Sequence, residues 1–180
     1  YGLRWTGERL QDGNGWGWTA EAAHQADYGN NPQAFSHSYW LLEPAYSVRG
    51  TTFKAGWEHL GGNGAHALQT PLATLHAFNG WDDKFLATPA GGLDDRYLSA
   101  SGKFGQVRDG RFAWTVAWHD YRADTALAGA GHYGSEWNAS LGFPLATRLQ
   151  ALLKIADYRA DHYARDTTKV WLQLEWASAK

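Results

Sequence analysis

Apolar and polar residues alternate with a period of two through most of this chain. In 111–118, for example, Phe112, Trp114 and Val116 fall on one face of an extended strand, and Thr115 falls on the other. This alternation is typical of a β-strand with one apolar and one polar face, and no long stretch shows the period of an amphipathic helix. The pattern predicts an all-β chain with nine strands, at 2–10, 15–27, 37–48, 51–60, 93–104, 111–122, 133–144, 147–159 and 167–177.

The lengths of the predicted strands and connections favour an outer-membrane barrel. Most strands have about ten residues, enough to cross a bilayer when tilted, whereas strands of water-soluble proteins average about five or six. Short and long connections alternate, which places the short turns at one end and the long loops at the other, as in outer-membrane barrels. The short ones are 12–15, 49–50, 106–110 and 145–146, and the long ones are 28–36, 61–92, 123–132 and 160–166.

Aromatic side chains gather near the strand ends. The chain has 11 Trp, 9 Tyr and 7 Phe residues, and so many Trp residues exceed what a core of this size needs. Two belts of Trp and Tyr at headgroup level are typical of membrane barrels. The alternative is a soluble β-sandwich in which these rings fill the core and each Trp N–H finds a partner. The predicted membrane-interface aromatics are Trp16, Trp18, Trp57, Trp118, Tyr133, Trp137 and Trp176.

The composition excludes several other classes of protein. The net charge of −2 argues against a nucleic-acid-binding protein, which would carry a basic surface. The absence of Cys excludes disulfides, thiolate metal sites and thiol nucleophiles. No apolar run is long enough for a transmembrane helix. Neither a nucleophile–base pattern nor a phosphate-binding loop nor a metal motif appears, so we expect no enzyme activity and no cofactor.

These features predict one domain over 1–180, an antiparallel transmembrane β-barrel with a long extracellular loop at 61–92. Bacterial single-chain barrels have even strand numbers and both termini in the periplasm, whereas nine is odd. An isolated nine-strand piece would leave its two edge strands unpaired in lipid, which is costly. We therefore expect this chain to be part of a larger, even-stranded barrel whose N-terminal strands lie in another segment or another chain.

One segment, 69–92, reads Gln-Thr-Pro-Leu-Ala-Thr-Leu-His-Ala-Phe-Asn-Gly-Trp-Asp-Asp-Lys-Phe-Leu-Ala-Thr-Pro-Ala-Gly-Gly. It resembles the long loop of the alginate-export family of bacterial outer-membrane porins, and 56–62 and 93–98 extend the match on both sides. Further matches follow in order at 118–121, 133–136, 154–158 and 166–171. The resemblance implies the C-terminal half of a barrel that passes small or polymeric solutes, without catalytic residues. The expected partners are the lipid bilayer, lipopolysaccharide, the solute and any chain that completes the barrel.

The alternation also assigns charged residues to the inward face of the predicted barrel. Both signs of charge occur there, whereas an exporter of a polyanion should have a cationic lumen. Two interpretations remain open: a weakly selective pore, or a self-neutralising wall that only maintains the barrel. The predicted pore-lining residues are Lys54, Glu58, Lys103, Glu136, Arg148, Lys154, Lys169 and Glu175.

The loop at 61–92 is too long for a simple connection and contains large apolar side chains that need burial. Folding into the lumen would bury them and constrict the pore. The alternatives are docking on a partner and packing on the loop's own rim. The spacing of His66 and His76 to Asp82 and Asp83 matches no metal motif. The predicted constriction residues are Leu72, Leu75, His76, Phe78, Trp81, Asp82, Asp83 and Phe85.

The motif Asp-Tyr-Arg-Ala-Asp occurs twice, at 120–124 and at 157–161. The interval equals two strands with their connections, so both copies should lie at the rim that carries the long loops. Three interpretations are open: a solvated rim of mixed charge, arginines that bind the carboxylates or lipid phosphates, or a Ca²⁺ site. The carboxylates of the Ca²⁺ interpretation are Asp120, Asp124, Asp157 and Asp161, with Asp166 near them in sequence.

Taken alone, the sequence predicts a porin located in the bacterial outer membrane. The second hypothesis is a non-transporting barrel that serves as a sheath or docking partner for another outer-membrane protein. The third is a soluble carbohydrate-binding β-protein that stacks sugars on exposed Trp rings.

Overall fold

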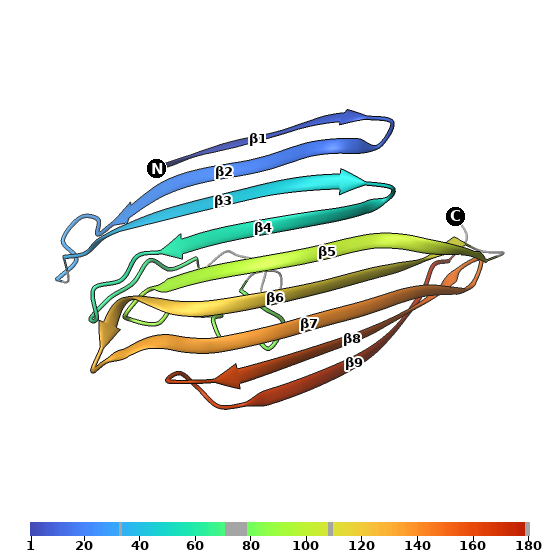
Figure 1. The fold of residues 1–180 in the computed structure, drawn as a ribbon. Coiled ribbons are helices and arrows are strands. Elements are labelled where there is room, and N and C mark those ends of the chain that lie inside the picture. The colour runs from blue at the N-terminus through green and yellow to red at the C-terminus, as the bar shows by residue number, and fades with distance from the viewer. Residues whose placement is uncertain (33, 71–78, 108–109, 179–180) are drawn as a thin grey trace.

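The residues that the structure describes form one antiparallel sheet of nine strands that follow one another in chain order (Figure 1). The computed structural model describes residues 1–32, 34–70, 79–107 and 110–178. The strands are β1 (Gly2–Gln11), β2 (Asn14–Ala26), β3 (Ser36–Val48), β4 (Thr51–Leu60), β5 (Leu93–Val107), β6 (Gly110–Leu127), β7 (Ala130–Ala146), β8 (Leu149–Ala160) and β9 (Thr167–Trp176). The predicted nine strands and the all-β class are therefore confirmed.

The order of the strands makes β1 and β9 the two edges of the sheet. Every neighbouring pair is antiparallel, so β1 and β9 run in the same direction. In the described part of the chain the two edges do not pair with each other, as the odd strand number predicts. The described residues also hold no helix with the length and apolarity that a membrane span requires.

Two predicted connections differ from the structure. The expected long loop at 123–132 is wrong, because β6 and β7 continue through it and meet in a tight turn at Ala128 and Gly129, with φ of 49° and 83°. Positive φ at both central residues gives the twist that a two-residue hairpin turn needs. The predicted turn at 145–146 belongs to β7, and the actual turn is Thr147–Arg148. Arg148 therefore lies in a turn rather than on the inner wall, which corrects its prediction as a pore-lining residue.

The connection between β4 and β5 folds back over one face of the sheet, here named the inner face, and parts of it are visible behind β5 to β7 in Figure 1. Its described residues Asp82 and Lys84 contact β8 and β9, through the Tyr158 amide and the Thr167 hydroxyl. The opposite face is the outer face. The predicted alternation holds on β6, where Val116 is on the outer face and Thr115 lines a cavity on the inner face.

A small aromatic core lies between this connection and the inner face. Tyr133 belongs to it, with only 5% of its surface exposed, so its prediction as a membrane-interface aromatic is wrong. The reason is a β-bulge: the β6–β7 register shifts between Tyr121 and Arg122, opposite Gly134, whose φ is 143°. One extra residue moves the following side chains to the other face of the strand. The buried core comprises Leu60, Leu68, Phe85, Leu93, Tyr121, Tyr133 and Tyr158.

The two ends of the β4–β5 connection touch through glycine backbones. A Cβ on Gly62 would lie 2.1 Å from the backbone nitrogen of Gly92, so no larger residue fits at Gly62 without displacing the chain. Gly64 donates a backbone hydrogen bond to Ala90 close by (2.8 Å). This close approach fixes where the connection leaves the sheet and returns to it.

We expect Gly62→Ala to destabilise the fold by about 1–3 kcal/mol, because the added methyl group must push the two backbones apart. In Gly17→Ala, the matched control, the new Cβ finds its nearest neighbour at 3.6 Å, an ordinary contact. The control should stay within about 0.5 kcal/mol of the parent. Urea denaturation of both variants measures the difference, and equal midpoints would contradict the tight approach.

Candidate functional site

The segment 79–85 of the β4–β5 connection is anchored on a buried carboxylate of β7. Glu136 is fully buried, and its Oε1 accepts hydrogen bonds from the backbone amides of Trp81 and Asp82, the second at 2.9 Å. Gly80 makes this approach possible, because its φ is 86° and a Cβ there would lie 2.2 Å from the Tyr121 hydroxyl. Hydrogen bonds from amides to a carboxylate are stronger than those to neutral acceptors.

Asp82 provides the next anchor. Its Oδ2 accepts a hydrogen bond from the Tyr158 amide (2.8 Å), and its backbone carbonyl accepts one from Lys169 Nζ (2.7 Å). Lys169 also forms an ion pair with Asp83 (2.9 Å). Burial raises the pKa of the Asp82 carboxyl, and the hydrogen bond from the Tyr158 amide opposes that rise. The predicted constriction residues Asp82 and Asp83 are thus bound to β8 and β9.

Phe85 inserts into a cage of tyrosines. Its ring centroid lies 4.5 Å from Tyr121, 5.3 Å from Tyr163, 5.9 Å from Tyr133 and 6.3 Å from Tyr158. Tyr121 and Tyr158 are the second residues of the two Asp-Tyr-Arg-Ala-Asp copies, and both are fully buried. The repeat therefore supplies two walls of one cage. This role was not predicted, although a tyrosine at the same position of both copies was visible in the sequence.

The outward residues of the same repeat form ion pairs at the rim. Arg122 Nε lies 2.7 Å from Asp120, and Arg159 Nε lies 2.9 Å from Asp157. These pairs match the second of the three interpretations of the repeat, in which arginines bind the carboxylates.

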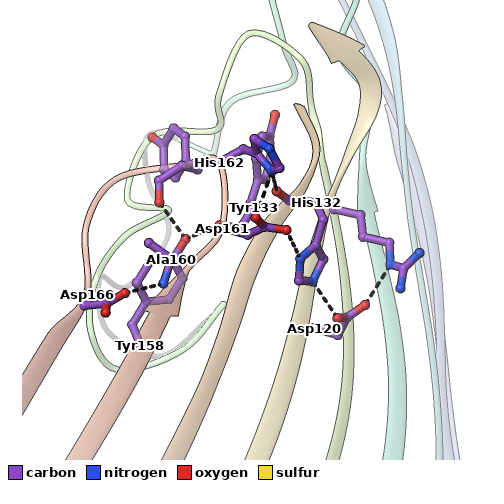
Figure 2. A network of polar contacts seen from close by, with 10 residues as sticks. Asp120, His132, Tyr133, Tyr158, Ala160, Asp161, His162 and Asp166 are labelled. Atoms are coloured by element: carbon purple, nitrogen blue, oxygen red, sulfur yellow. Dashed lines mark hydrogen bonds and ion pairs between the residues drawn. The ribbon is translucent and has the colours of Figure 1, made fainter. Parts of the chain in front are cut away.

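The remaining rim carboxylates have other partners. His132 joins Asp120 (2.8 Å) to Asp161 (2.9 Å), as Figure 2 shows, and its hydrogen bond lowers the pKa of the Asp161 carboxyl. Asp124 accepts a hydrogen bond from the Gly62 amide (3.0 Å). The predicted Ca²⁺ set of Asp120, Asp124, Asp157 and Asp161 is therefore wrong as one site in the described residues. His132 binds Asp120 and Asp161, whereas Arg159 binds Asp157 and the Gly62 amide binds Asp124.

Segment 79–85 contacts two of the predicted pore-lining carboxylates. Glu136 and Glu58 lie on the inner face, but segment 79–85 covers them and leaves them 0% and 8% exposed. Glu58 accepts hydrogen bonds from the Tyr39 hydroxyl and from Asn79 Nδ2, both at 2.8 Å. This burial makes both carboxylates anchors of the loop. It corrects the pore-lining assignment of Glu136 alone, because Glu58 also borders the cavity on the inner face.

The other predicted pore-lining residues lie partly under segment 79–85 and partly on the uncovered inner face. Lys154 on β8 lies over the Trp81 ring (4.3 Å) and near the Trp171 ring (5.2 Å). Lys54 on β4 forms an ion pair with Glu43 (2.9 Å). Lys103 on β5 and Glu175 on β9 are exposed near the short turns.

Four residues of the predicted constriction set lie outside the described residues: Leu72, Leu75, His76 and Phe78.

A cavity in two adjoining parts remains on the inner face, over β1 to β6. One part of about 380 Å³ is lined by Glu43, Lys54, Tyr97 and His119 among others, and a second part of about 720 Å³ is lined by Arg4, Glu21 and Tyr39 among others. Both parts are bordered by Arg4, Tyr39, Glu58 and Asn79. Ion pairs and hydroxyl groups share this surface with apolar side chains such as Leu41, Leu60 and Leu68.

A buried histidine–carboxylate pair on this wall was not predicted from the sequence. His119 Nδ1 lies 2.9 Å from Asp95 Oδ1, and Asn79 Nδ2 donates to Asp95 Oδ2 (3.1 Å). Both residues stand at inward positions of the alternation, which was the available signal. The pair joins segment 79–85 to β5 and β6.

No protein-family model matches the chain, and no curated protein or solved structure shows significant similarity to it. The resemblance to the alginate-export family therefore stays a prediction.

We expect Phe85→Ala to release segment 79–85 from the inner face, because truncating a buried Phe costs about 3–5 kcal/mol. Leu86→Ala is the matched control, since Leu86 is 50% exposed and follows Phe85 directly. Limited proteolysis should cut the β4–β5 connection much faster in Phe85→Ala than in the parent or the control. Equal cleavage rates would contradict the anchoring role of Phe85.

Proposed function

We propose that this chain forms part of the wall of a β-barrel pore in the bacterial outer membrane, with segment 79–85 narrowing the lumen. The observation that carries the proposal is an apolar band on the outer face. On β6 the band comprises Phe112, Trp114, Val116 and Trp118 and ends at Asp120. Exposed apolar surface of this extent is unfavourable in water, and it resembles the lipid-facing surface of a membrane barrel.

The band continues across the edge strand β9. Val170, Leu172, Leu174 and Trp176 are 64%, 70%, 61% and 69% exposed, whereas the residues between them face inward. Apolar surface in water costs roughly 25 cal/mol per Å², and lipid chains would remove that cost. Six of the seven predicted membrane-interface aromatics lie on this face: Trp16, Trp18, Trp57, Trp118, Trp137 and Trp176.

The band runs obliquely to the hydrogen-bond rows of the sheet. Along one row of directly paired residues, Trp5 and Trp57 on β1 and β4 give way to Arg96, Asp120 and Arg159 on β5, β6 and β8. The boundary between the apolar band and the charged rim therefore lies closer to the short turns on β8 than on β4. A level membrane boundary crosses hydrogen-bond rows in this way when the strands are tilted, as in barrels.

Closure of the pore needs further strands. Since β1 and β9 run in the same direction, an antiparallel ring closes only with an odd number of additional strands between them. We infer that these strands come from another segment or another chain, which gives the even total of bacterial barrels.

The inner wall supports passage of hydrophilic solutes with weak charge selectivity. Arg4 pairs with Glu21 (2.9 Å), and Lys54 pairs with Glu43 (2.9 Å), so neighbouring strands neutralise each other. The resemblance to the alginate-export family extends the proposed range of solutes to polysaccharides such as alginate.

Two measurements on the full-length protein test the proposal. A barrel requires detergent for extraction and changes its mobility in SDS gels on boiling, and a porin conducts ions across a planar bilayer. Deleting 68–90 should raise the single-channel conductance, because segment 79–85 would no longer occupy the lumen. A protein soluble without detergent would instead support a carbohydrate-binding function, and a heat-modifiable barrel without conductance would support a sheath.

We expect Val116→Arg to destabilise the protein in phospholipid vesicles by about 2–4 kcal/mol, the cost of an arginine at the bilayer midplane. Thr115→Arg, one residue away, places the same charge toward the inner cavity and should cost much less. Urea unfolding in the vesicles measures both, and equal costs would contradict a lipid-facing outer surface.

A further inference from the structure

Three potential metal ligands meet at the base of the β4–β5 connection. His59 lies at the end of β4, Asp94 near the start of β5 and Asp124 in the extended part of β6. One ligand atom from each of them lies within 4.8 Å of the others. Strand pairing brings them together, because His59 and Asp94 are direct partners across β4 and β5.

Two of these atoms are in hydrogen-bond contact, which a bound ion would replace. His59 Nδ1 and Asp94 Oδ1 are 3.0 Å apart. Tetrahedral coordination with bonds of about 2.0–2.2 Å separates neighbouring ligand atoms by roughly 3.3–3.6 Å, so a small opening of this pair admits the ion. The carboxylate of Asp124, which is exposed, closes the third side.

Other contacts orient the three side chains. Trp57 Nε1 donates to Asp94 Oδ1 (3.0 Å), and the Gly62 amide donates to Asp124 Oδ2 (3.0 Å). The His59 ring stacks on Trp40 with a centroid distance of 5.3 Å and an interplanar angle of 13°. Partners of this kind hold metal ligands in place and contribute strongly to affinity.

We propose that His59, Asp94 and Asp124 bind a divalent first-row metal ion, with Zn²⁺ as the best match. Two carboxylates balance the charge of the ion, and an imidazole nitrogen favours Zn²⁺ over Ca²⁺, which takes six to eight oxygen ligands. Binding needs the lone pair of Nδ1, so any proton there moves to Nε2 or to solvent. Water completes the coordination.

The ion would cross-link the two ends of the β4–β5 connection. His59 precedes Gly62 by three residues and Asp94 follows Gly92 by two, so the ion links the strands on both sides of the connection. Asp124 extends this cross-link to β6, and its carboxylate also accepts a hydrogen bond from the Gly62 amide. Metal cross-links that close long loops stabilise them by restricting the unfolded chain. The site needs no pore, so it does not rest on the proposed function.

Titration of the metal-free full-length protein with Zn²⁺ alone tests this inference. We expect one equivalent to bind and to raise the melting temperature, whereas Ca²⁺ and Mg²⁺ at the same concentration leave it unchanged. His59→Gln and Asp124→Asn should each weaken Zn²⁺ binding at least about tenfold, the lower limit even for partners of metal ligands. Asn at 124 retains an oxygen for the Gly62 amide, which preserves the fold.

The matched control is His162→Gln, which removes an exposed imidazole from the rim network of Figure 2 and leaves the three ligands intact. This variant should bind Zn²⁺ like the parent. The inference is overturned if the parent shows no saturable binding, if Ca²⁺ stabilises it equally, if His59→Gln binds Zn²⁺ like the parent, or if binding disappears in His162→Gln.

Discussion

The sheet has two faces of opposite polarity, and this constraint organises everything else in the molecule. Each strand alternates apolar and polar residues, so the outer face collects Leu98, Val116, Trp137 and Leu172, while the inner face collects ion pairs and carboxylates. Water can cover the inner face at little cost, but it covers the outer face only at a cost proportional to its area. Lipid against the outer face and water against the inner face would satisfy both, which is why the outer band carries the functional proposal.

The polar inner face makes possible a type of packing that an apolar core would not allow. Segment 79–85 brings its own backbone amides to the wall, and Glu136 accepts two of them in a buried position. Phe85 adds the apolar part of the interface inside its tyrosine cage. Since a buried carboxylate without donors would be strongly destabilising, Glu136 and the segment stabilise each other.

The period of two predicted the strands and most of their faces, because both follow from local geometry. Tyr133 was assigned to the wrong face, since a single bulge residue reverses the alternation and leaves no clear mark in the sequence. The turn at Ala128 was missed because Ala rarely adopts positive φ.

The partners of the charged residues were beyond prediction from the sequence alone. The partners of Asp120 and Asp124 depend on strand register and on the path of a long connection, which are non-local. The same dependence explains why Asp95 and His119 were missed as a pair.

The position of the loop decides which strands would control passage through the proposed pore. Lys154 and Lys169 on β8 and β9 are engaged by Trp81 and Asp83, so their charges are largely withdrawn from the lumen. The cavity remains on the other side, over β1 to β6, where ion pairs such as that of Arg4 and Glu21 form part of the exposed wall. A solute that follows the open side meets paired charges rather than a cationic lining. Selectivity in such a pore would therefore come from the width left beside segment 79–85 more than from net charge.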